Sequence, residues 1–118
     1  MNKNNIEIAR SYYTAIGKKN IQEFEQYLHP DVKVINPLIE RTGKEVVLEA
    51  LKGFIEAFNT LTIRAAFDSP DQAILVIDVD YPAPIGNIRT ASLISIQDAL
   101  IVKIELFFDG RPFQTRLV

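Results

Sequence analysis

The 118-residue chain holds 13 lysine and arginine side chains against 15 aspartate and glutamate side chains, for a formal net charge of −2. It has no cysteine and one histidine, which excludes disulfides, thiolate catalysis and metal sites built from cysteine or clustered histidine. No basic stripe marks a nucleic-acid interface, and no apolar run reaches the ~20 residues that span a membrane. We therefore expect one cytoplasmic domain over residues 1–118 that has no cofactor and binds neither nucleic acid nor membrane.

The start of the chain predicts two helices. Apolar side chains recur at helical spacing between Asn5, the expected N-cap, and Gly17, the expected end of the first helix. Asn20 and Glu23 form a capping-box pair, which predicts a second, short helix that ends by Pro30.

A strand and a longer helix are predicted next. Residues 32–36 alternate in polarity and stop at Pro37, which indicates a short strand. Thr42 and Glu45 form another capping-box pair, and the apolar stripe over residues 47–58 predicts the helix that follows them.

The second half of the chain predicts four strands joined by turns rich in proline, glycine, aspartate and asparagine. These strands cover residues 61–67, 73–81, 88–96 and 100–108. Helices grouped first and hairpin-linked strands second predict an α+β fold with a mainly antiparallel sheet.

The strand predicted over residues 73–81 is apolar on both of its faces. Its odd-numbered residues are all apolar, and Ile74 and Val76 share the other face with two aspartates. Three helices can cover one face only, so a second copy of the chain is the simplest cover for the other. The sequence therefore predicts a homodimer.

Those two aspartates, Asp78 and Asp80, are the candidate catalytic residues. Apolar neighbours disfavour the ionised form of a carboxylate, raise its pKa and make it a useful acid or base. Arg89 follows the proline-rich turn and is expected to pair with Asp80, which makes it a candidate ligand-binding residue too. The alternative is an ordinary ion pair at the end of the sheet.

Candidate ligand contacts come from the first helix and the last strand. Tyr12 and Tyr13 are adjacent in mid-helix, and a buried tyrosine hydroxyl needs a partner that a ligand oxygen could supply. Filling the core is the alternative role for both tyrosines. On the last strand, Leu106 and Phe108 belong to a fully apolar face that we expect to line the interior.

Three stretches of the chain carry a family resemblance. They are residues 11–20 in the first helix, residues 28–43 around the first strand, and the closing strand with its Asp-Gly-Arg-Pro turn over residues 100–113. Together and in this order they resemble the SnoaL-like and ketosteroid-isomerase-like families, which share the cystatin-like fold of nuclear transport factor two. The resemblance implies a cone-shaped, curved sheet wrapped around three N-terminal helices, with a pocket for a small hydrophobic molecule.

The resemblance also places particular residues in that pocket. In the steroid isomerases of this fold, the position of Asn36 holds the aspartate that shuttles the proton, and the oxyanion-hole tyrosine corresponds to Tyr12. An amide cannot act as the base, so a strict ketosteroid isomerase is not expected. Limonene-epoxide-hydrolase-like relatives do have an asparagine at the position of Asn36, but their second acid falls at Leu106 here.

Two hypotheses about function remain open from the sequence. The first is an isomerase-, cyclase- or hydrolase-type enzyme that moves a proton with Asp80 or Asp78 and binds its substrate through Tyr12, Tyr13 and Asn36. The second is a non-catalytic module that binds a small hydrophobic molecule in the same pocket.

Overall fold

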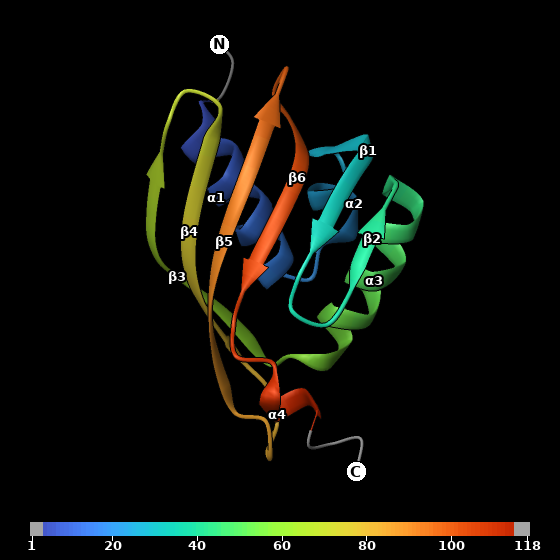
Figure 1. The fold of residues 1–118 in the computed structure, drawn as a ribbon, viewed down its shortest axis with the longest axis vertical. Coiled ribbons are helices and arrows are strands. Elements are labelled where there is room, and N and C mark those ends of the chain that lie inside the picture. The colour runs from blue at the N-terminus through green and yellow to red at the C-terminus, as the bar shows by residue number, and fades with distance from the viewer. Residues whose placement is uncertain (1–3, 115–118) are drawn as a thin grey trace.

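Three helices cover one face of a six-stranded sheet in the computed structural model, which describes residues 4–114 (Figure 1). The helices are α1 (Asn5–Gly17), α2 (Ile21–Glu25) and α3 (Lys44–Ala57), and a short α4 (Arg111–Gln114) follows the last strand. None of the helices among these residues is long and apolar enough to cross a membrane.

The sheet is built mainly from the second half of the chain. Its strands are β1 (Leu28–Ile35), β2 (Glu40–Thr42), β3 (Thr60–Asp68), β4 (Gln72–Asp80), β5 (Asn87–Gln97) and β6 (Leu100–Phe107). They lie in the order β2-β1-β6-β5-β4-β3, and all neighbours are antiparallel except β1 and β6. The sheet is curved and does not close (Figure 1), so the expected α+β fold with a curved, mainly antiparallel sheet is confirmed.

The helix starts follow the expected capping chemistry in one case of three. The Asn20 side chain accepts a hydrogen bond from the Glu23 backbone N–H at 3.2 Å, so the N-cap at Asn20 is confirmed. The return bond of a capping box is not formed, because the Asn20 backbone N–H donates to Ala15 instead. The N-cap of α1 is Asn4 rather than Asn5. The Thr42 cap is wrong: Thr42 ends β2, and α3 begins after Gly43, whose φ of 97° suits a residue without a Cβ.

The four strands expected in the second half are present, with ends that differ by at most one residue. The first strand is longer than expected, because β1 begins at Leu28 and passes through Pro30 with a break in its pairing to β6. The sequence reading missed the edge strand β2 and the helix α4.

Side-chain alternation divides β4 and β5 into two faces. The inner face, toward the helices, is buried; it carries Leu75, Ile77 and Val79 from β4 and Thr90, Ser92 and Ile94 from β5. The outer face is left uncovered by the helices (Figure 1). Function therefore depends on which of these two faces each candidate residue occupies.

Candidate functional site

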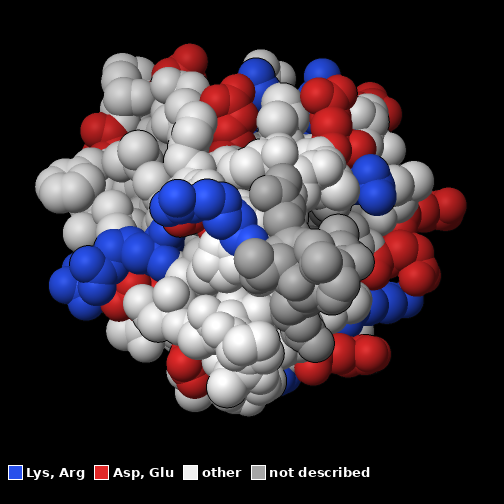
Figure 2. All heavy atoms as spheres, turned by 60° about the horizontal axis from the view of Figure 1, so that its bottom comes forward, with Lys and Arg blue, Asp and Glu red and all other residues white. Residues whose placement is uncertain are grey.

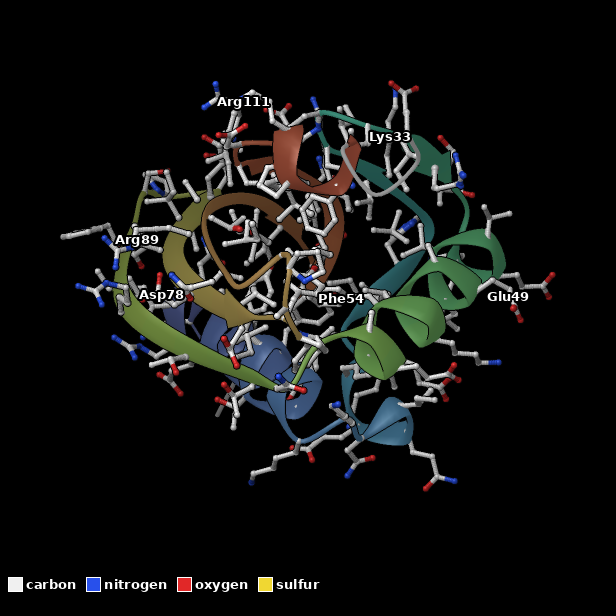
Figure 3. The ribbon with its side chains drawn as sticks, turned by 90° about the horizontal axis from the view of Figure 1, so that it is seen from below. Lys33, Glu49, Phe54, Asp78, Arg89 and Arg111 are labelled. Carbon is white, nitrogen blue, oxygen red and sulfur yellow. The ribbon has the colours of Figure 1, made fainter. Side chains whose placement is uncertain are left out.

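A partly enclosed cavity of about 220 Å³ lies between the inner face of the sheet and helices α1 and α3. Its wall is mainly apolar and includes Ile16 from α1, Val47, Leu51 and Phe54 from α3, and Val34, Ile77, Val79, Ile104 and Leu106 from the sheet. The α3 residues recur at helical spacing and so form one stripe. Figure 3 shows Phe54 on the side of α3 that faces the sheet and Glu49 on the side that faces away.

The cavity reaches solvent at the end of the molecule where the β1–β2 connection, the end of β6 and α4 come together. Its wall there includes Leu38, which is 42% exposed. Phe113 of α4 packs against Tyr81 and Phe108, with ring centroids 5.1 and 5.6 Å apart. Figure 2 views this end, where blue Lys or Arg atoms lie near the centre among uncharged residues and most other charged side chains lie toward the rim.

Tyr13 meets its hydrogen-bonding need within the protein. Its hydroxyl lies 2.7 Å from the Ser92 hydroxyl in a fully buried contact between α1 and β5. Burial raises the pKa of Tyr13 to about 12, so the phenol stays neutral at physiological pH. This pair joins the helix to the sheet beneath the cavity.

Tyr12 and Thr90 present hydroxyls to the cavity. The two side chains are 1% and 5% exposed, and neither makes a hydrogen bond within residues 4–114. In this part of the chain, every side-chain oxygen or nitrogen that is fully enclosed has a hydrogen-bond partner. Because the hydroxyls of Tyr12 and Thr90 have no partner, they are not fully enclosed and must be open to the cavity that they line. Burial raises the pKa of Tyr12 well above its ordinary value, and the neighbouring Tyr13 raises it further. Both hydroxyls are therefore neutral groups able to bond a ligand.

Asn36 is held in place by its own turn. Its Oδ1 accepts hydrogen bonds from the backbone N–H groups of Leu38 and Ile39 at 2.8 and 2.9 Å. Only the carbonyl oxygen of an amide can accept two such bonds, so the orientation of the amide is fixed. The Nδ2 donor makes no hydrogen bond within the described chain, and Asn36 lines the cavity.

The ionisable groups on the described cavity wall are three tyrosines and Arg41. Burial raises the pKa of Tyr81 to about 12, as it does for Tyr13. Within residues 4–114, no aspartate, glutamate, histidine or lysine lines the cavity. This wall therefore offers hydrogen bonds and apolar surface, but no group that takes up a proton near neutral pH.

Asp78 lies on the outer face of the sheet, and the expectation that its pKa is raised is wrong. Its carboxylate accepts hydrogen bonds from Arg89 at 2.8 Å and from Arg64 at 3.1 Å. The Arg89 guanidinium, more than any other neighbour, lowers the pKa of Asp78 to about 2. Figure 3 shows the Asp78–Arg89 pair on the outside of the sheet, away from Phe54. An ionised carboxylate in this position is a partner for arginine rather than an acid or base for a ligand in the cavity.

Asp80 also lies on the outer face. The register places it opposite Asn87, and Asp78 opposite Arg89, so the expected Asp80–Arg89 pair is replaced by Asp78–Arg89. The carboxylate of Asp80 instead accepts a hydrogen bond from the Asn59 amide at 3.3 Å. Strand alternation explains the result, because the residues next to the aspartates in β4 are the ones that line the cavity.

A profile of the SnoaL-like domain matches residues 9–104. The chain belongs to the SnoaL-like domain family. No curated protein matches it in sequence.

Solved structures share the fold of this SnoaL-like domain at low sequence identity. An NTF2-like protein of unknown function from Cytophaga hutchinsonii is 16% identical, with 97% of both chains covered and a TM-score of 0.85. A protein of unknown function with a cystatin-like fold from Xanthomonas campestris is 24% identical, with 94% of this chain and 95% of the other covered and a TM-score of 0.84. A protein from Kribbella flavida described as a candidate ketosteroid isomerase is 17% identical, with 89% and 77% covered and a TM-score of 0.77.

The cavity of the SnoaL-like domain brings together most of the residues expected to bind a ligand. Those on its wall are Tyr12, Tyr13, Asn36, Leu106 and Phe108. Arg89 lies outside it, paired with Asp78. Their part in ligand binding stays a prediction.

The sequence reading missed two polar residues of the wall, Thr90 and Arg41. The alternation of residues 88–96 already places Thr90 on the same strand face as Ile88, so its position could have been found. Arg41 had no such signal, because it belongs to the unrecognised strand β2.

Proposed function

We propose that this SnoaL-like domain binds a small, largely apolar molecule in the cavity as a non-catalytic module. The composition of the wall carries this proposal: mainly apolar side chains with a few hydroxyls, the Asn36 amide and Arg41, and no carboxylate or imidazole among the described lining residues. A positioned general base contributes ~10²–10⁴-fold to a proton-transfer rate, and the described lining residues include none. A cavity of about 220 Å³ exceeds the ~150 Å³ apolar cavity that holds benzene, so a ligand of one or two rings is favoured.

Calorimetric titration with methyl 2-naphthoate, a neutral two-ring ester, tests the proposal. Ala50 lines the cavity and Ala57 is an exposed residue at the end of the same helix. Ala50→Phe fills the cavity and is expected to weaken binding at least about tenfold, whereas Ala57→Phe adds the same ring outside it and leaves binding unchanged. Equal binding by both variants, each folded by circular dichroism, would contradict the proposal.

Proton-transfer catalysis of isomerase, cyclase or hydrolase type is the second candidate function. The observation that favours it is the presence of Tyr12 and Asn36 on one cavity wall, as the resemblance to steroid isomerases implies. The similarity in fold to the Kribbella protein described as a candidate ketosteroid isomerase supports it at the level of architecture only. Asp78 and Asp80 face away from the cavity, so such an enzyme would need a base from elsewhere.

We also propose that the outer sheet face pairs with a second copy of the chain. Two large side chains on this face, Phe67 and Phe107, are 63% and 54% exposed, and cross-strand pairing puts Ile74 beside the first and Ala91 beside the second. The same face carries both signs of charge, including the Asp78–Arg89 and Lys103–Glu105 pairs. A two-fold related copy can therefore cover apolar surface with apolar surface and set cations against anions. The cytoplasmic location and the lack of nucleic-acid and membrane partners stay predictions.

A further inference from the structure

Arg41 brings a permanent positive charge to the wall of an otherwise neutral cavity. It pairs with Val34 across the β1–β2 hairpin, and Val34 lines the cavity. Directly paired residues of an antiparallel pair project from the same face of the sheet, so Arg41 projects toward the cavity. Its neighbours in β2, Glu40 and Thr42, project from the opposite face of the sheet. There the Glu40 carboxylate forms an ion pair with the Lys33 ammonium at 3.4 Å.

No acid among the described residues neutralises the charge of Arg41. Its Nη1 donates a hydrogen bond to the backbone carbonyl of Glu40 at 3.0 Å, and no carboxylate of residues 4–114 lies within ion-pair distance of its guanidinium. A guanidinium carries five N–H donors and no acceptor, so most of its donors remain available. Three other arginines, Arg64, Arg89 and Arg111, each form an ion pair with an aspartate.

A second donor lies on the same hairpin. The Asn36 backbone N–H donates to Ile39, and Val34 pairs with Arg41, so Asn36 and Arg41 are diagonal neighbours across the hairpin. Such neighbours are ~7–8 Å apart, within reach of one another's side chains. The Asn36 amide is fixed with its oxygen occupied and its Nδ2 donor unpaired, so this end of the cavity offers donors without matching acceptors.

We propose that the ligand of this cavity is an amphipathic carboxylate whose apolar body fills the cavity and whose carboxylate binds Arg41 and the Asn36 amide. The planar guanidinium matches the two oxygens of a carboxylate and can bond both at once. The neutral hydroxyls of Tyr12 and Thr90 lie on the same wall and are free to bond an oxygen on the ligand body. This inference rests on the proposed binding function and adds the charge of the ligand to it.

Matched ligands and matched variants test the inference. Binding of 2-naphthoate and of methyl 2-naphthoate is measured by calorimetry at pH 7, and the ratio of the two affinities is the readout. We expect the acid to bind about tenfold more tightly than the ester, and added salt to reduce that ratio because the arginine is partly exposed. Arg41→Gln should bring the ratio close to one because it weakens binding of the acid far more than binding of the ester, and Arg41→Lys should give an intermediate ratio.

Arg10→Gln is the control, because Arg10 is an exposed residue of α1 that does not line the cavity and the substitution changes net charge equally. It should leave the ratio unchanged. Equal binding of acid and ester by the unaltered protein, or an equal loss of both ligands in Arg41→Gln, would overturn the carboxylate inference while leaving the proposed binding function standing. Failure of both ligands to bind would overturn the two together.

Discussion

The inner and outer faces of β4 and β5 carry different chemistry, although neighbouring residues of the same strands supply both. Inward, Ile77 and Val79 line a mainly apolar cavity; outward, Asp78 is ionised between two arginines. An aspartate one position along this strand would have pointed into the cavity. The comparison teaches that a carboxylate in an apolar strand becomes an acid or base only if the alternation of side chains turns it toward the ligand.

The largest expected effect is on the free energy of unfolding, and it compares a buried residue of the inner face with its neighbour on the outer face. Leu75 is fully buried, and Ile74 lies on the uncovered face. Leu75→Ala should lower the free energy of unfolding by ~2–5 kcal/mol, because it leaves a cavity in the core, whereas Ile74→Ala should cost less than about 1.5 kcal/mol. Urea denaturation at one protein concentration measures both values. Equal losses would show that the outer face is as tightly packed as the inner one.

A second prediction places a carboxylate on the inner face, where the described wall has none. Asn36→Asp supplies a base in the cavity that also holds Tyr12, so weak isomerisation of a Δ5-3-ketosteroid is expected at ~10²-fold or more above the unaltered protein. An absorbance assay of the conjugated product measures it, with Asn59→Asp at the outer face as the control. Strong activity in the unaltered protein would show that another residue is the base and would favour the enzymatic candidate.

A third prediction tests the outer face as an interface between two copies. Phe107→Glu puts a charge on the exposed apolar surface, and two-fold symmetry places that charge in the interface from both copies. The substitution should raise the dimer dissociation constant ~100-fold. Val46→Glu is the matched control, because Val46 is 48% exposed on α3 rather than on the sheet. Light scattering at micromolar concentration measures the effect, and a monomeric unaltered protein would contradict the dimer. Glu105→Ala should likewise change association more than ligand binding.

The smallest expected effect is on the pKa of Asp78 in its ion pair with Arg89 on the outer face. The pKa of Asp78 is lowered to about 2, so the pair stabilises the folded protein above the ordinary aspartate pKa of 3.8 and loses that contribution as the pH falls toward 2. Carboxyl-carbon NMR titration should show this low midpoint, and Arg89→Gln should move it back toward the ordinary value. An ordinary midpoint in the unaltered protein would contradict the outer-face geometry.

The fold could be predicted from the sequence because most elements have an unambiguous period and clear turn residues. The N-cap at Asn20 and the four later strands are examples. Strand β2 was not predicted because its sequence, Glu-Arg-Thr, is polar throughout. The strand lies exposed at the edge of the sheet, where burial imposes no alternation of apolar and polar residues. Helix α4 was not predicted because its four residues are too few to show apolar side chains at helical spacing.

The site was harder to predict than the fold for a physical reason. Since β4 is apolar on both faces, its sequence does not say which face meets the helices, and the aspartates were assigned to the wrong environment. The pairing of Arg89 depended on the length of the turn before it, which sets the register. Asn36 was predicted on the cavity from family resemblance rather than from periodicity, and Tyr12 from both the resemblance and its place in the first helix.

The parallel pairing of β1 with β6 has a consequence for how the protein is made. Val34 pairs with Ile104, roughly 70 residues further along the chain, and β6 is the strand that joins β1 to the rest of the sheet. During synthesis the hairpin of β1 and β2 must therefore wait until β6 has been made before it is anchored. Until then the cavity lacks the wall formed by β6, so ligand can be held only after that strand has been made.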